Sequence, residues 1–155
     1  MLAERLFAMQ STSAPQLGRS TGGTPDWTPA IAAAFCAGNM DQRWYNAARL
    51  KYSLDWSTAN ALEYAVWLEA ALIASREKWK IPTGREYIRK MAGLAIAEMA
   101  EPRRYRYDVI KTAWLGCDPA QWTKVWGKRY NAVFAIPNDW ASEALRHVEK
   151  RLADI

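Results

Sequence analysis

Helix start and stop signals follow one another along this chain, and that succession constrains the fold more than any other feature. Predicted starts pair a small polar capping residue with a following apolar stretch of helical period, and glycine or proline marks the predicted ends. No run of the sequence shows the strict apolar–polar alternation that is typical of half-buried strands. The sequence therefore predicts an all-α protein, a compact multi-helix bundle.

The predicted helices span about 28–38, 41–50, 57–79, 83–101, 105–116, 119–134 and 138–153. Apolar residues nearly encircle the helix at 57–79, which predicts that it is central and buried. Pro137 predicts a break between the last two helices, because proline removes a helix hydrogen bond.

A flexible N-terminal segment is predicted over residues 1–26, since residues 11–26 are rich in Ser, Thr, Gly and Pro. Residues 27–155 are predicted to form a single helical domain, with a helix-turn-helix-like segment at about 105–134. The first ten residues contain Glu4 and Arg5 and lack a long apolar run, so neither a signal peptide nor a membrane span is predicted. We expect a cytoplasmic protein without membrane contact.

The residues that usually support catalysis or metal binding are scarce. Cys36 and Cys117 are the only cysteines and His147 is the only histidine, so no zinc site, other metal site or cofactor is predicted. Cys117 is expected to be a small apolar plug, and His147 to be solvated between charged neighbours. Neither a catalytic set nor a phosphate-binding motif is recognisable, and we expect a protein that is not an enzyme.

The positive charge is concentrated in one window. The formal net charge is +5, and residues 103–129 carry seven basic and two acidic side chains. Such a local excess favours a polyanionic partner. The nine tryptophans lie mostly at helical spacing beside small apolar residues, which predicts core positions rather than base-stacking platforms.

The same window contains the parts of a helix-turn-helix. Its first helix offers an apolar inner face of Val109, Ile110, Ala113 and Leu115, and Gly116 supplies the sharp turn. Asp118 and Pro119 predict the start of the second helix. The residues of that helix predicted to pack inward are Trp122, Val125, Trp126 and Val133, with Tyr130 at the margin.

The opposite face of the second helix carries residue types that suit the major groove of double-stranded DNA. Glutamine and asparagine pair with adenine edges, and lysine pairs with guanine or phosphate. The predicted residues on this face are Ala120, Gln121, Lys124, Lys128 and Asn131, of which the first three are the best candidates for reading bases. Arg103, Arg104 and Arg106 precede the first helix and are expected to contact backbone phosphates.

The stretch LGCDPAQWTKVWGKRY resembles the helix-turn-helix of small phage and prophage regulators, and among these the late-gene antitermination proteins of the Q type. The resemblance covers about residues 105–135. It implies a protein that binds DNA near a late promoter, joins paused RNA polymerase and lets it read through terminators. It carries over no polymerase-contacting residue.

Several alternatives stay open from the sequence. Thr112 stands where a small residue is usual, and Gly127 interrupts the second helix, so an ordinary helical hairpin with a solvated basic face is one alternative. The others are a helical protein-binding adaptor or inhibitor, for which tryptophan and arginine are favoured contact residues, and a DNA-packaging subunit of the small terminase type. The sequence leaves the oligomeric state and the DNA target open.

Overall fold

The computed structural model describes residues 39–80 and 85–154, and every regular element in these ranges is helical. The prediction of an all-α fold is confirmed. The described residues form two compact units, one of residues 39–58 and 140–154, the other of residues 59–80 and 85–139. The helix predicted at 28–38, the segment 1–26 and the capping box beginning at Thr83 lie outside the described residues. That residues 27–155 form a single domain stays a prediction.

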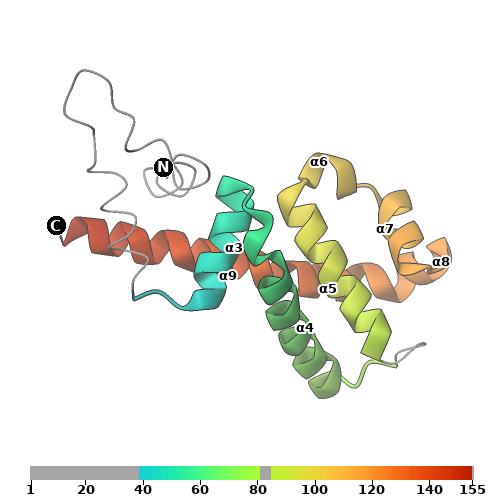
Figure 1. The fold of residues 1–155 in the computed structure, drawn as a ribbon. Helices are drawn as coiled ribbons and strands as arrows, with labels where there is room; N and C mark the ends of the chain where they lie inside the picture. Colours follow the sequence, from blue (N-terminus) through green and yellow to red (C-terminus); the bar gives the residue numbers. More distant parts are fainter. Residues whose placement is uncertain (1–38, 81–84, 155) are drawn as a thin grey trace. The chain divides into compact units, whose positions relative to one another are not determined.

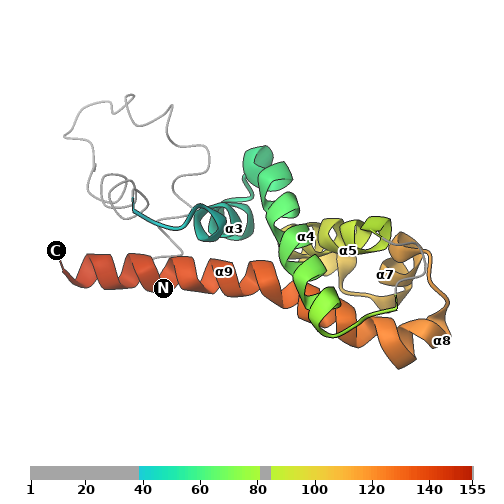
Figure 2. The same ribbon diagram turned by 90° about the horizontal axis from the view of Figure 1, so that it is seen from below.

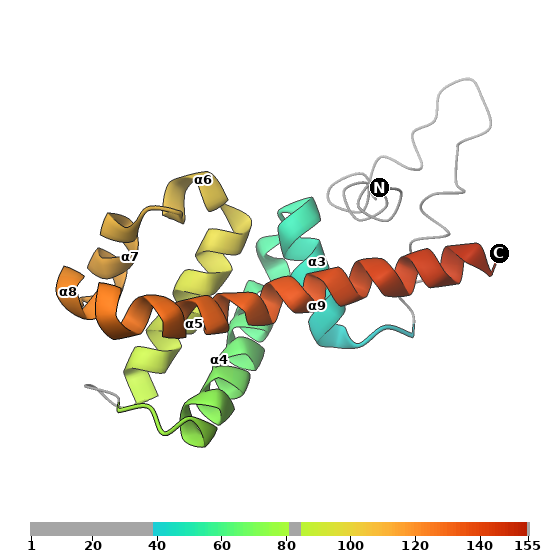
Figure 3. The same ribbon diagram turned by 180° about the vertical axis from the view of Figure 1, so that it is seen from behind.

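In the first unit, helix α3 (Gln42–Ser53) packs against the C-terminal part of helix α9 (Gly127–Ala153), as Figures 1 and 3 show. The Asp41 carboxylate caps α3 by accepting a hydrogen bond from the Arg43 backbone N–H at 2.9 Å. A short 3-10 helix, Trp56–Thr58, follows α3. The buried residues that join the two helices are Ala48, Ala144, Leu145 and Val148, with Trp44 and Tyr45 packed around them.

His147 faces α3 instead of solvent. Its ring meets the Trp44 ring edge-on, with 6.5 Å between the ring centroids. The His147 Nε2 atom is buried and has no hydrogen-bond partner among the described residues. The prediction of a solvated histidine is therefore wrong, because tertiary contact with α3 covers a side chain that its charged sequence neighbours placed at the surface.

The second unit is built around helix α5 (Arg85–Ala100), which contacts α4 (Ala59–Arg76), α6 (Pro102–Tyr105) and α7 (Asp108–Leu115). Figures 1 and 2 show α5 among these helices, with α7 followed by the short helix α8 (Pro119–Gln121). A π-helical turn, Trp122–Trp126, joins α8 to the beginning of α9.

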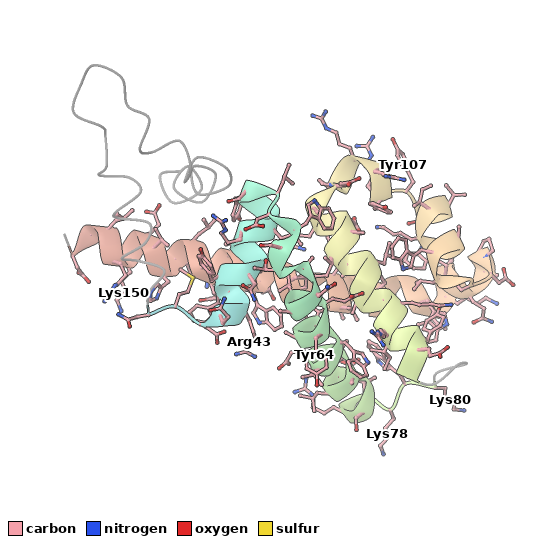
Figure 4. All side chains as sticks on the ribbon, viewed as in Figure 1. Arg43, Tyr64, Lys78, Lys80, Tyr107 and Lys150 are labelled. Carbon is pink, nitrogen blue, oxygen red and sulfur yellow. The ribbon has the colours of Figure 1, made fainter. Side chains whose placement is uncertain are left out.

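Helix α5, not α4, is the buried helix of this unit. All residues from Leu94 to Ala100 are buried. Helix α4 buries a single stripe and leaves Tyr64, Leu68 and Leu72 at 58%, 45% and 58% exposed, with Tyr64 labelled in Figure 4. The prediction that the helix at 57–79 is central is wrong, because the small residues of α5 admit neighbours on more than one side.

Helix α9 continues through Pro137 without a break, so the predicted interruption is also wrong. Proline at this position removes the hydrogen bond to the carbonyl four residues earlier. The Pro137 ring is fully buried, and the Asn138 side-chain amide donates to the Phe134 carbonyl at 2.9 Å. The missing bond is the one to the Val133 carbonyl, so burial of the ring and the Asn138 bond stabilise the helix at this point without replacing it.

Candidate nucleic-acid interface

A tight turn joins α7 to the next helix, and its residues act as the sequence predicted. Gly116 ends α7 with a φ of 67°, in the left-handed region that glycine adopts without strain. The backbone N–H groups of Gly116 and Cys117 both donate to the Thr112 carbonyl. The Asp118 carboxylate then accepts from the Ala120 N–H at 2.9 Å and caps the helix in which Pro119 is the first residue.

The π-helical turn explains the glycine that interrupts the second helix. The Gly127 N–H donates to the carbonyl of Trp122, five residues earlier. A Cβ atom at Gly127 would lie 3.0 Å from that same oxygen and 3.5 Å from the Trp122 ring. Glycine therefore fits the widened turn, and π-helical turns are frequent at functional sites.

The helix that follows the turn has an inner and an outer face. Trp122, Trp126, Tyr130 and Val133 are 0–6% exposed and form the inner face. Tyr130, predicted at the margin, is fully buried, whereas Val125 is only half-buried. The opposite side, here called the outer face, consists of exposed residues only, namely Ala120, Gln121, Lys124, Lys128 and Asn131.

A buried triad of Glu98, Lys111 and Tyr130 holds α5, α7 and α9 together. The Tyr130 hydroxyl donates to Glu98 Oε1 at 2.7 Å, and Lys111 Nζ lies 3.1 Å from the same oxygen. Lys111 Nζ also lies 5.2 Å from the centroid of the Tyr130 ring. Burial, followed by the hydrogen bond to Glu98, raises the pKa of Tyr130, so its hydroxyl stays protonated and keeps donating. The triad therefore fixes how α7 meets the helix that carries the outer face.

Helix α7 turns a different side inward from the one predicted. Its buried residues are Lys111 and Leu115. Val109 is 71% exposed, Ile110 is 38% exposed and Ala113 is exposed, so these three expected core contacts are wrong. They were predicted to lie in the core only because their side chains are apolar. In the structure, the ion pair with Glu98 turns the Lys111 side of the helix inward instead. Leu115, four residues later and on the same side, is the one predicted contact that the structure keeps.

The three arginines at 103, 104 and 106 are all exposed and are here called the arginine cluster. The Arg104 guanidinium lies 5.4 Å from the Tyr105 ring centroid and 3.6 Å from the Glu101 carboxylate. The Arg106 guanidinium lies 4.8 Å from the Tyr107 ring centroid and donates to its hydroxyl at 2.8 Å. Tyr107 lies at the outer edge of the unit in Figure 4. The aromatic neighbours orient two of the three cations.

Two of the seven basic side chains between 103 and 129 are committed to the fold. Lys111 belongs to the buried triad, and the Arg129 guanidinium contacts the rings of both Trp79 and Trp126, 5.3 and 4.8 Å from their centroids. The other five are exposed, three in the arginine cluster and two on the outer face. All eight residues predicted to contact DNA are therefore at the surface.

Comparison with protein-family models, curated proteins and solved structures gives no match for this chain. Among the helices of residues 39–80 and 85–154, none has the length and apolar character needed to cross a membrane. Within the same ranges, no three or more His, Cys, Asp or Glu side chains are grouped so that they could hold a metal ion.

Proposed function

We propose that this protein binds double-stranded DNA through the outer face and the arginine cluster, and acts as a transcription regulator of the phage type. The observation that carries the proposal is the outer face. It combines amide and lysine side chains, all exposed, on a helix whose other side is anchored by two buried tryptophans and Tyr130. An anchored helix with free polar residues at its beginning suits insertion into a major groove.

The positions of the five exposed cations support separate roles. Lys124 and Lys128 lie on the helix itself, beside Gln121, and are placed to reach base edges and flanking phosphates. The arginine cluster precedes α7 and so lies outside the reading helix. Cations placed there suit contacts with the phosphate backbone, which supply affinity without sequence choice.

The regulatory part of the proposal rests on the resemblance of residues 115–130 to phage and prophage regulators. The antitermination proteins among them imply RNA polymerase as a second partner. The tight turn at Gly116 and the Asp118 cap support the resemblance, since both are features of a helix-turn-helix.

The test is a binding titration of the full chain against a random duplex at several salt concentrations. Five phosphate-contacting cations predict that log K falls with log salt with a slope of up to about −4.5. Selection from a random duplex pool then identifies the preferred site. An affinity that does not change with salt, or a selected pool without a shared sequence, would refute DNA reading by this surface.

A second candidate function, a protein-binding adaptor, is favoured by one observation. Tyr107, Val109 and Ile110 are 50%, 71% and 38% exposed on and beside α7. Exposed apolar patches often mark protein interaction sites. A protein whose partner docks mainly on these residues would elute from a heparin column with little salt dependence, unlike a DNA-binding protein.

A further inference from the structure

The turn that precedes the outer face borders a pocket of about 320 Å³. The pocket lies between α5, the end of α7 and the beginning of the next helix, all in the second unit. Its volume is near the lower end of the range for small-molecule sites, roughly 300–1,000 Å³. Its lining includes Tyr87, Lys90, Leu115, Cys117, Gln121 and Trp126.

Tyr87 presents a poorly satisfied polar group at this pocket. The residue is 5% exposed, and its buried hydroxyl makes no hydrogen bond of good geometry to the described residues. Burial raises the pKa of Tyr87, and a hydrogen-bonding interaction with the Cys117 thiol raises it further. The hydroxyl is therefore neutral and can donate, but a thiol is a weak acceptor. A ligand oxygen that displaces the half-buried Cys117 side chain would satisfy it.

The other walls indicate the kind of ligand. The Tyr87 ring lies against the Trp126 ring with 4.3 Å between centroids, and Leu115 adds an aliphatic surface. Aromatic and aliphatic walls favour a flat apolar body. Lys90 is exposed and supplies a positive charge. The Asp118 carboxylate at the same pocket carries a negative charge, and its Oδ1 accepts from the Ala120 N–H, so the carboxylate of a ligand must lie on the Lys90 side.

We propose that this pocket binds a small aromatic carboxylate, with its ring against Trp126 and its oxygens on Lys90 and the Tyr87 hydroxyl. Gln121 lines the pocket and is also a predicted base-reading residue. A bound ligand that contacts the Gln121 amide removes it from DNA, so the ligand weakens specific binding. This coupling rests on the proposed function, whereas the pocket itself does not.

The test uses 4-hydroxybenzoate as the probe and 4-hydroxybenzamide as its uncharged match, titrated into the full chain without DNA. The readout is the NMR signal of the Trp126 indole N–H, assigned by a Trp126→Phe variant. We expect saturable, millimolar binding of the carboxylate, as suits a ligand of about ten non-hydrogen atoms. Lys90→Met should weaken the affinity for 4-hydroxybenzoate about five-fold or more and leave the affinity for 4-hydroxybenzamide unchanged. Tyr87→Phe should weaken the affinity for both probes.

Lys124→Met is the matched control, because it removes a lysine of the outer face that does not line the pocket. An absent or non-saturating signal, or equal effects of Lys90→Met and Lys124→Met, would overturn the pocket proposal whether or not the protein binds DNA. In a second experiment, a saturating concentration of 4-hydroxybenzoate should weaken binding of the selected duplex about three-fold or more. Because the coupling of two binding equilibria is reciprocal, the duplex should weaken binding of 4-hydroxybenzoate by the same factor. Probe binding without this change would leave the ligand site intact and refute its coupling to DNA.

Discussion

Replacing Glu98 by glutamine tests how strongly the buried triad stabilises the second unit. Glu98 and Lys111 have side chains only 8% and 10% exposed, and their charged atoms are 3.1 Å apart. Glutamine keeps the size of the side chain and an oxygen for the Tyr130 hydroxyl, but leaves the Lys111 ammonium buried without its counter-charge. Breaking a buried ion pair in this way destabilises proteins by about 3–5 kcal/mol. For a chain of this size, the melting temperature should fall by roughly 10 °C.

The assay is urea unfolding and thermal melting followed by circular dichroism, with two control variants. Asp41→Asn removes a carboxylate from an exposed ion pair with Arg43, so the loss should be below about 1 kcal/mol. The triple variant Glu98→Leu, Lys111→Met, Tyr130→Phe removes every polar member of the triad together. It should recover most of the stability that Glu98→Gln loses, because apolar replacement of a buried ion pair is often neutral. A Glu98→Gln protein within about 1 kcal/mol of the parent would refute the reasoning.

Three further predictions concern the interface and its support. Lys124→Ala should weaken binding of the selected duplex by about 1–3 kcal/mol and binding of a scrambled duplex much less. Arg104→Ala should weaken binding of both duplexes equally and reduce the slope of log K against log salt by about one. Filter binding of the two duplexes at several salt concentrations measures both effects, and equal behaviour of the two variants would contradict their separate roles. Trp122→Ala should lower the free energy of unfolding by about 3–5 kcal/mol, because the side chain is only 6% exposed. If urea unfolding gives a loss below about 1 kcal/mol, Trp122 does not belong to the core. Gly116→Ala should destabilise the protein by about 1–2 kcal/mol through its φ of 67° alone, because no atom lies within 4 Å of the added carbon. Ala113→Gly, at an exposed position of α7, is the comparison, and an unchanged melting temperature of Gly116→Ala would argue against the left-handed turn.

Local signals identified the turn correctly because local chemistry determines it. Asp118, Pro119 and Gly116 act within a few residues of their own position, through a side-chain cap, a fixed φ and a left-handed φ. The sequence predicts the beginning of α3 at about residue 41 in the same way, and in the structure the Asp41 side chain caps that helix. The alternation of buried Trp122 and Trp126 with exposed Lys124 and Lys128 also follows from helical spacing, which the sequence displays directly.

The inward side of α7 could not be read from the sequence in the same way. Lys111 is drawn inward by Glu98, which lies on another helix, and no pattern within α7 marks that partner. Once Lys111 and Leu115 face the core, helical geometry turns Val109 outward despite its apolar side chain. The pocket beside Tyr87 was missed for a related reason, since its walls come from α5, the turn and the following helix.

Sequence by itself determined that the chain is helical, where most of its helices begin, and which residues of the helix after Gly116 reach the surface. Those properties depend on propensity, caps and periodicity, which act within one or two turns of helix. Only the tertiary structure decided that α5 rather than α4 is buried, that α9 continues through Pro137, and that Lys111 joins Glu98 and Tyr130. Those outcomes depend on contacts between segments far apart in the chain, where packing and burial of paired charges outweigh local preference.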